Sequence, residues 1–172
     1  MSRIDLIKEK IVPQDGIESL IHRIRVKGKK VVFTNGVFDI LHRGHVTLLN
    51  KASELGDFLI VGLNSDASVR TLGKGPERPI NGEGDRAIVL ASLQCVGAVI
   101  CFEESTPYEL IRLIMPDVLV KGGDYNPKQS DPNKADYIVG SDLMNDEGKN
   151  VVSINLVEGY STTGIIEKSK NG

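Results

Sequence analysis

The sequence predicts an α/β fold in which helices cover both faces of a doubly wound, parallel sheet. Three observations predict this fold class. Short apolar, β-branched runs alternate along the chain with stretches of helical periodicity. One run, residues 58–63, is almost continuously apolar, as expected of a strand that is covered on both faces. The 172 residues suffice for one full core, and we find no internal repeat.

The elements are expected in a regular order. Residues 3–27 should form a helix, because four isoleucines and leucines recur on one face between Ile17 and Ile24. Strands are expected at residues 29–34, 58–63, 97–102, 118–120 and 151–156, and helices at 45–55, 85–93, 106–115 and from about 161 onward. The helix after Thr106 should begin with a capping box closed by Glu109. Residues 125–150 are polar and predict a surface excursion with one helical turn near 137–144.

Composition excludes several classes of protein. A net charge of −2 gives no broad basic face for nucleic acid. No apolar run approaches the roughly 18 residues of a membrane span, and the first residues lack the apolar stretch of a signal peptide. We therefore expect a cytoplasmic protein with neither nucleic acid nor membrane as a partner. The two cysteines, Cys95 and Cys101, are expected to be ordinary core thiols, although their pairing stays open.

The most informative stretch is His42-Arg43-Gly44-His45, which follows a strand and a glycine turn and opens a helix. Unpaired N–H groups and the helix dipole favour an anion at that position. Imidazoles can donate hydrogen bonds to phosphate oxygens, and Gly44 lets a phosphate approach the backbone. The pattern predicts phosphate chemistry on a nucleotide. A metal site is the alternative, but the only other histidine, His22, lies in a different segment, so we expect none.

Further candidate residues follow the other strands, because ligands of open α/β sheets bind beyond the carboxyl ends of the strands. They are Asn35, Gly36, Phe38 and Asp39 after the first strand, Asn64 and Asp66 after the second, Lys121, Gly123 and Asp124 after the fourth, and Ser161, Thr162 and Thr163 at the last helix. Turns or helix caps would explain several of these residues equally well.

Residues 70–79 contain two glycines, two prolines and three cations, among them Lys74 and Arg78. The composition predicts a mobile loop that folds over a triphosphate, with a solvated charged loop as the alternative. Arg86 lies at the start of a helix, where a cation opposes the dipole, and this favours an anion partner nearby.

Together these segments resemble the cytidylyltransferase-like nucleotidyltransferases, the His-x-Gly-His superfamily. The matching stretches are residues 34–45, 61–66, 121–125 and 161–163. The resemblance covers about residues 29–170. It implies a Rossmann-like nucleotidyltransferase domain at 29–172, preceded by an N-terminal helical extension at 1–28. Within the superfamily, residues 64–69, 78–81, 116–125 and 161–168 resemble the adenylyltransferase domain of bacterial ADP-heptose synthase.

This resemblance implies transfer of AMP from ATP to D-glycero-β-D-manno-heptose 1-phosphate, giving ADP-heptose for lipopolysaccharide and pyrophosphate. It implies catalytic roles for His42, His45 and Lys74, and nucleotide binding by Asn35, Gly36, Phe38, Gly44, Asn64, Asp66, Arg86, Lys121, Gly123, Asp124, Ser161, Thr162 and Thr163. Asp39 and Arg78 would bind the acceptor, and Mg²⁺ would arrive with ATP, held mainly by phosphate oxygens. Relatives are often dimers, but the residues leave the oligomeric state open.

Glycerol-3-phosphate cytidylyltransferases, which use CTP, are the alternative. They usually carry an arginine where this chain has Leu156, and Gly-Asp-Asp-Trp where it has residues 122–125. Many relatives of the heptose branch are fused to a sugar kinase, so a separate kinase is expected to supply the sugar phosphate here. A regulator that has lost catalysis is another class, although both histidines are present. A dinucleotide-binding redox domain needs Gly-x-Gly-x-x-Gly, which residues 35–39 do not supply.

Overall fold

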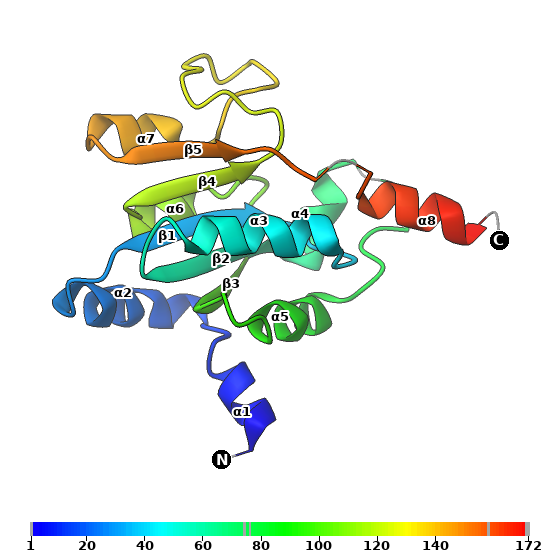
Figure 1. Ribbon diagram of the computed structural model, residues 1–172, viewed down its shortest axis with the longest axis horizontal. Helices are drawn as coiled ribbons and strands as arrows, with labels where there is room; N and C mark the ends of the chain where they lie inside the picture. Colours follow the sequence, from blue (N-terminus) through cyan, green and yellow to red (C-terminus); the bar gives the residue numbers. More distant parts are fainter. Residues whose placement is uncertain (1, 74, 76, 158, 171–172) are drawn as a thin grey trace.

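The computed structural model describes residues 2–73, 75, 77–157 and 159–170. In this part of the chain five parallel strands form one sheet in the order β3-β2-β1-β4-β5 (Figure 1). The strands are β1 (Val31–Gly36), β2 (Phe58–Asn64), β3 (Ala98–Phe102), β4 (Val118–Gly122) and β5 (Asn150–Ile154). The predicted α/β class with a doubly wound parallel sheet is confirmed. Because the order reverses between β1 and β4, the chain leaves these two strands in opposite directions, which opens a crevice at their carboxyl ends.

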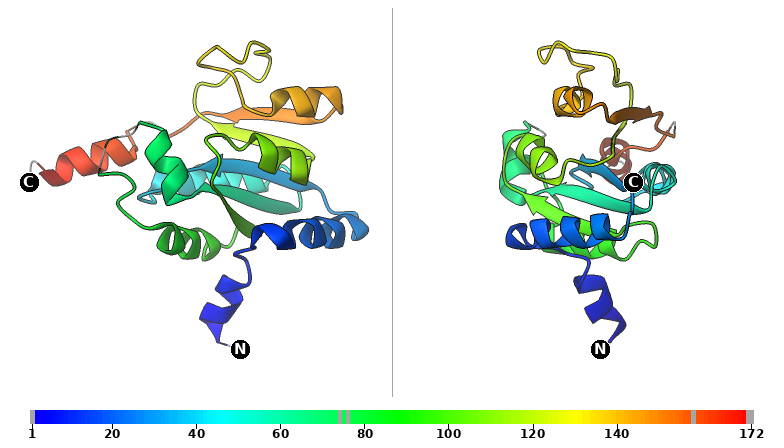
Figure 2. Two further views of the ribbon diagram at one scale, coloured as in Figure 1. Left: turned by 180° about the vertical axis from the view of Figure 1, so that it is seen from behind. Right: turned by 90° about the vertical axis from the view of Figure 1, so that its left-hand side faces the viewer.

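The helices cover both faces of the sheet (Figure 2). They are α1 (Arg3–Lys8), α2 (Ile17–Val26), α3 (Arg43–Ser53), α4 (Asp66–Thr71), α5 (Glu83–Ala91), α6 (Tyr108–Ile114), α7 (Ser141–Asp146) and α8 (Thr162–Lys170). Buried side chains of α2, α6 and α7 form one apolar cluster, and those of α3 and α5 form another. The sheet lies between them, since successive residues of a strand face opposite sides: Phe33 joins the first cluster and Val32 the second.

The predicted continuous helix over residues 3–27 is wrong. The chain leaves the helical conformation after α1, and Ile11 forms a parallel bridge with Val99 at the edge of β3. The Val12 N–H donates to the Val99 carbonyl at 2.9 Å, and the Val99 N–H donates to Lys10 at 2.8 Å. Pro13 then disfavours a helical conformation in the residue before it. Helix α2 begins at Ile17 and adds four buried side chains to the core.

Three further expectations are corrected. Helix α6 begins after Pro107 without a side-chain cap, so the capping box predicted at Thr106 does not form. The loop expected from residue 70 starts later, because residues 66–71 form α4, which Ser65 caps through a 3.1 Å hydrogen bond from the Ser68 N–H. The segment 125–150 is not wholly a surface excursion, because Ile138 and Met144 are buried in the core. No helix of the described residues is long and apolar enough to cross a membrane. Both cysteines are free thiols and partly exposed.

Candidate active site

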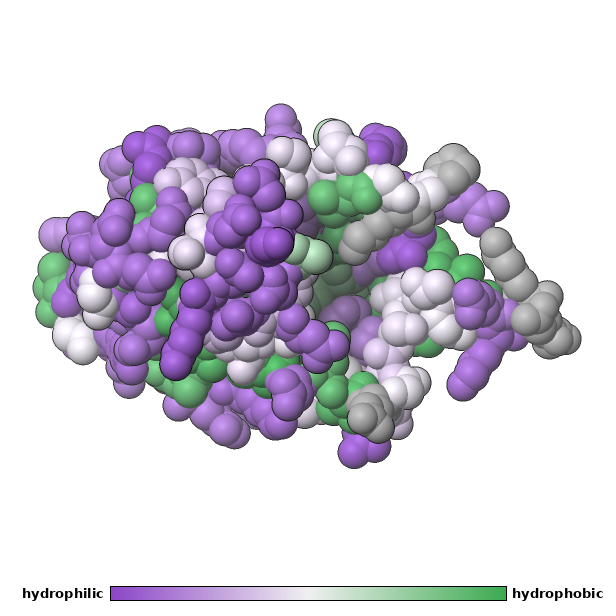
Figure 3. Space-filling model, turned by 90° about the horizontal axis from the view of Figure 1, so that it is seen from above, coloured by the Kyte–Doolittle hydropathy of each residue, from purple (hydrophilic) through white to green (hydrophobic). Residues whose placement is uncertain are grey.

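A cavity of about 470 Å³ lies at the carboxyl ends of β1 and β4. Figure 3 shows one face of the molecule hollowed, with apolar side chains visible in the hollow. The cavity brings together many of the predicted site residues: Asn35, Gly36, Phe38, Asp39, His42, Gly44, His45, Arg78, Lys121, Ser161, Thr162 and Thr163. Segments from the middle and from both ends of the predicted domain therefore meet at the crevice.

The two histidines lie side by side at the N-terminus of α3. His42 occupies the N-cap position with extended backbone (φ −138°, ψ 171°), and its side chain makes no capping hydrogen bond. Its ring stacks on the ring of His45 with 3.8 Å between centroids and 20° between planes. Phe38 meets His45 edge-on at 5.1 Å. Both imidazoles are thus held next to the first N–H groups of a helix of 11 residues.

Gly44 is required by the position of the His42 ring. A Cβ at residue 44 would lie 3.0 Å from both Nδ1 and Cε1 of His42, and 3.3 Å from the Cβ of Tyr160. The Nδ1 atom of His42 is buried and has no hydrogen-bond partner among the described residues. Burial lowers the pKa of the His42 imidazole below its ordinary value of 6.5. The ring is therefore neutral at pH 7, and a neutral ring with an unbonded Nδ1 can still donate from Nε2.

The turn after β1 is set by Phe38, a non-glycine residue in the left-handed region (φ 47°). The Phe38 ring folds back over Gly36, where a Cβ would lie only 2.9 Å from the ring. This turn places the next residue, Asp39, with only 2% of its surface exposed. The glycine and the left-handed phenylalanine therefore aim the carboxylate into the cavity wall.

The Asp39 carboxylate is fully engaged. Its Oδ1 accepts hydrogen bonds from the N–H groups of Ile80 and Asn81 at 2.8 and 2.9 Å. Its Oδ2 forms an ion pair with the Nε of Arg78. Burial by itself raises the pKa of this carboxyl, but the hydrogen bonds from Asn81 and Ile80 and the Arg78 charge outweigh it and hold the pKa below 3.8. Asp39 therefore stays ionised and anchors residues 78–81.

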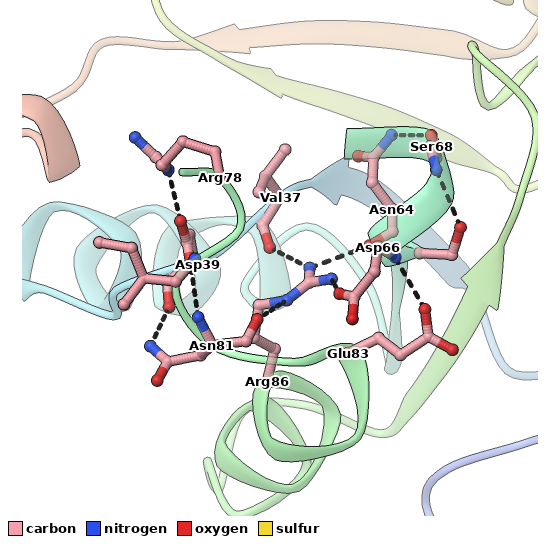
Figure 4. A network of polar contacts seen from close by, with 11 residues as sticks. Val37, Asp39, Asn64, Asp66, Ser68, Arg78, Asn81, Glu83 and Arg86 are labelled. Atoms are coloured by element: carbon pink, nitrogen blue, oxygen red, sulfur yellow. Dashed lines mark hydrogen bonds and ion pairs between the residues drawn. The ribbon is translucent and has the colours of Figure 1, made fainter. Parts of the chain in front are cut away.

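Arg86, expected beside an anionic ligand, is instead buried in a polar network (Figure 4). Its Nη1 donates to the carbonyls of Val37 (2.7 Å) and Asn64 (2.9 Å). Its Nε donates to Asn81 O at 2.9 Å, and its Nη2 pairs with Asp66 at 2.7 Å. Three predicted nucleotide ligands, Asn64, Asp66 and Arg86, thus join the ends of β1 and β2 to α5, and none of them lines the cavity.

Lys121 lies at the end of β4. Its Nζ donates to Asn35 Oδ1 at 3.2 Å and lies 5.5 Å from the centre of the Tyr125 ring. Gly123 (φ 118°) is hydrogen-bonded to β5, where its N–H donates to Ile154 and its carbonyl accepts from Ser153. Gly123 and Asp124 do not line the cavity, so from this segment the structure brings Lys121 and its neighbours Gly122 and Tyr125 to the site.

The segment before α8 closes one side of the cavity. Tyr160 contacts Arg43 of α3, with 3.4 Å between the hydroxyl and Nη1 and 5.6 Å between the guanidinium carbon and the ring centre. Ser161 caps α8, because its Oγ accepts the Gly164 N–H at 3.0 Å. The N-termini of α3 and α8 therefore meet at the cavity, and both favour negative charge.

Several cavity residues were not predicted as ligands: Val37, Leu48, Gly122, Tyr125, Leu156 and Tyr160. Apolar residues next to strand ends carry no chemical signal of their own. Val37, Gly122 and Tyr125 lie within the motifs, and Tyr160 directly precedes one. Lys74 lies outside the described residues. Among the described residues, no group of three His, Cys, Asp or Glu side chains is arranged to hold a metal ion.

Comparison with known proteins finds a matching family model and similar sequences. A family model described as cytidylyltransferase-like matches residues 33–168. Bifunctional protein HldE of Wolinella succinogenes is 53% identical over 161 residues, covering 94% of this chain and 31% of that protein. The protein of the same name from Nitratiruptor sp. is 54% identical over 155 residues, covering 90% of this chain and 31% of that protein. The chain thus spans less than a third of these relatives.

Two solved structures are similar. A lipopolysaccharide core biosynthesis protein of Thermoplasma volcanium has a TM-score of 0.56 and 28% identity, covering 78% of this chain and 100% of that one. A pantoate-beta-alanine ligase of Francisella tularensis has a TM-score of 0.54 and 16% identity, covering 93% of this chain and 76% of that one. The second likeness shows the fold alone.

Proposed function

The chain belongs to the cytidylyltransferase-like family, and from this premise we propose that it transfers AMP from ATP to D-glycero-β-D-manno-heptose 1-phosphate, giving ADP-heptose and pyrophosphate. The observation that carries the reaction class is the stacked His42–His45 pair at the N-terminus of α3, inside a cavity that α8 also faces. The resemblance of several segments to the heptose branch supports the choice of substrate. So do the relatives named HldE and the Thermoplasma lipopolysaccharide protein.

The reaction is an in-line displacement. A phosphate oxygen of the acceptor attacks the α-phosphorus of ATP, the bond from that phosphorus to the α–β bridging oxygen breaks, and pyrophosphate leaves with the electron pair. The acceptor oxygen is already anionic, so no strong general base is needed. Catalysis consists of positioning the two phosphates and stabilising the charge that develops on the bridging oxygen.

The residues divide this work. His42 and His45 would donate to oxygens of the triphosphate near the reacting phosphorus, and Lys74 would add a positive charge. Ser161, Thr162 and Thr163 would hold the β- and γ-phosphates at the N-terminus of α8. The nucleoside would lie toward β4, where Lys121 and Tyr125 offer a cation and an aromatic face. Both thiols are free, which fits the reducing cytoplasm that we propose as the site of this reaction.

Mg²⁺ belongs to this proposal as part of the ATP substrate, with phosphate oxygens as its main ligands. The described side chains offer it little, since both oxygens of Asp39 already accept hydrogen bonds from the protein. The ion would neutralise the triphosphate, while the chain binds and orients the complex.

The second candidate is a glycerol-3-phosphate cytidylyltransferase that uses CTP. Leu156 argues against it: the side chain lines the cavity, so an apolar group stands where the rival family usually has an arginine. The residues 122–125 also depart from the rival pattern.

A matrix of substrates tests the proposal. ATP, CTP, GTP and UTP are each combined with heptose 1-phosphate and glycerol 3-phosphate, and pyrophosphate release is measured. We expect ATP with heptose 1-phosphate to give the highest kcat/KM. A higher value for CTP with glycerol 3-phosphate would overturn the branch, while leaving the reaction class in place. No pyrophosphate with any pair would favour a regulator without catalysis.

A further inference from the structure

We propose that Asp39 is a positioning residue whose buried carboxylate presents the Arg78 guanidinium to the phosphate of the acceptor. The inference rests on the proposed function and deepens it, because it names the chemical task of each member of this ion pair. Asp39 touches no substrate and no metal in this assignment. It acts through Arg78 and through the short segment 78–81.

The Asp39 carboxylate holds the whole segment 78–81. Besides the Arg78 Nε and the two N–H groups of Ile80 and Asn81 at Asp39 oxygens, the Asn81 side chain donates to the Asp39 carbonyl at 2.6 Å. Four hydrogen bonds from one short segment thus converge on one residue whose side chain is fully buried. These hydrogen bonds restrain residues 78, 80 and 81, on both sides of residue 79. They therefore also restrain the position of the Arg78 side chain.

The segment 78–81 is also anchored at its far end, through Asn81. The Asn81 carbonyl accepts from the Nε of Arg86 at 2.9 Å, and the same guanidinium binds the carbonyl of Val37, two residues before Asp39 (Figure 4). Asp39 and Asn81 are therefore tied to each other directly and again through Arg86. Because Arg86 is itself buried, this network ties the position of Arg78 to the core of the protein.

The contacts of Asp39 leave it unsuited to act as a general base or as a metal ligand. Each of its oxygens accepts at least one hydrogen bond from the protein, and the pKa of the carboxyl is lowered. A general base needs an oxygen that can take a proton near neutral pH, and a metal ligand needs an oxygen open to the ion. Neither condition is met. The negative charge of Asp39 therefore acts by pairing with the Arg78 guanidinium and holding it in place.

The terminal amino groups of Arg78 are suited to bind a phosphate. Only Nε is used by Asp39, and within the described residues no other hydrogen bond of this side chain is found. The two terminal amino groups form a planar fork that suits two oxygens of one phosphate. Arg78 reaches the cavity from the connection between β2 and β3, whereas Lys121, Tyr125 and residues 161–163 reach it from the β4 and β5 side. If the nucleotide lies on the β4 and β5 side of the cavity, Arg78 is the cation among the described cavity residues that is left to bind the acceptor phosphate.

The test is a double-mutant cycle with Asp39→Asn, Arg78→Ala and the double variant. We expect each single variant to raise the KM for heptose 1-phosphate about 10- to 100-fold, as for loss of a charge-assisted hydrogen bond, with a much smaller change in the KM for ATP. Adding Asp39→Asn to Arg78→Ala should change little further, because Asp39 acts through Arg78. Arg23→Ala, an exposed cation on α2, is the matched control and should match the wild type.

Two outcomes would overturn the assignment. The first outcome is that Asp39→Asn lowers kcat, and lowers it again when it is added to Arg78→Ala. That result would make Asp39 a base or a metal ligand. A change in the Mg²⁺ concentration needed for half-maximal rate in Asp39→Asn, but not in Arg78→Ala, would do the same.

A second measurement does not depend on enzymatic activity. Hydrogen exchange at the Ile80 and Asn81 amides should be slow in the wild type and fast in Asp39→Ala, while the amides of β2 keep their protection. If Asp39→Ala does not fold, the same exchange rates are measured in Asp39→Asn. Protection unchanged in both variants would overturn the anchoring role. If the wild type transfers no nucleotide, the proposed function fails, yet exchange and the weaker binding of inorganic phosphate by Arg78→Ala still decide this inference.

Discussion

At the scale of single residues, His42 stands where a helix ordinarily carries a capping side chain. Serine, threonine, aspartate or asparagine there would bond the first N–H groups and stabilise the helix by about 1 kcal/mol. His42 makes no such bond, and its ring turns away to stack on His45. The helix thus lacks a side-chain cap at some cost in stability, as expected if its N-terminus binds the anion that we propose.

Replacing His42 should therefore separate activity from stability. We expect His42→Ala and His45→Ala to lower kcat by roughly 10²- to 10³-fold, the scale of one lost preorganised donor. His42→Asn should lose activity similarly but gain a cap and raise the melting temperature by about 2–4 °C. Pyrophosphate release and thermal unfolding measure the two effects. Near-normal turnover in both alanine variants would contradict the catalytic assignment.

Burial of His42 also predicts how stability depends on pH. The folded-state pKa lies below the ordinary 6.5, so the unfolded chain binds a proton at this residue more readily than the folded one. Above pH 6.5 both states are neutral and the residue contributes no pH dependence. As the pH falls below 6.5, protonation favours the unfolded state until the folded pKa is passed. Denaturant midpoints should therefore decline more steeply in the wild type than in His42→Gln across this window, and parallel curves would contradict it.

Gly44 links the same ring to the backbone. Gly44→Ala should displace the His42 ring, because the added Cβ would lie 3.0 Å from it. Misplacing a catalytic group by about 1 Å costs on the order of 10²-fold in rate; the ring has to move by less than that, so we expect a loss in kcat of about 3- to 10-fold. Gly84→Ala is the control, since a Cβ in α5 at that position meets nothing within 4 Å. Equal activity of both variants would show that the ring tolerates the shift.

At the scale of elements, local patterns predicted most of the fold. The apolar run of β2 and the strand, glycine turn and His-x-Gly-His order around α3 depend on neighbours in sequence, and both were confirmed. Arg86 shows the limit of such reasoning. Its position in α5 suggested an anion, but its partners are carbonyls of residues 37, 64 and 81, which only the tertiary fold brings together. The bridge between Ile11 and Val99 likewise joins distant segments and breaks the expected long helix.

Helix α8 is the element that we expect to respond to ligand. It projects from the body of the protein (Figure 1), and none of its residues whose side chains are described is buried. Ser161→Ala removes its cap and a predicted phosphate donor, so ATP binding should weaken more than AMP binding. Ser169→Ala, on the last turn of the same helix, is the matched control. Calorimetric titration of both nucleotides checks this; equal weakening for ATP and AMP would exclude a contact to the terminal phosphates.

At the scale of the whole molecule, the crevice depends on a support that is separate from it. Arg86 is 2% exposed and joins the ends of β1 and β2 to the start of α5. The cavity walls built on Val37 to Asp39 and on residues 78–81 both rest on this one guanidinium. The contacts explain how a cation is accommodated in the interior: its guanidinium donates to three carbonyls and pairs with one carboxylate.

Removing this support should unfold the protein more readily without any direct contact to substrate. Arg86→Ala leaves the buried carbonyls of Val37 and Asn64, the partly buried Asn81 carbonyl and Asp66 without this donor, which costs about 3–5 kcal/mol and lowers the melting temperature by roughly 10 °C. The matched control is Arg112→Ala on α6. That arginine is 64% exposed and pairs with Glu109 at the surface, so its loss should cost less than about 1 kcal/mol. A wild-type melting temperature in Arg86→Ala, together with weakened ATP binding, would instead return Arg86 to the nucleotide site that its sequence position suggested.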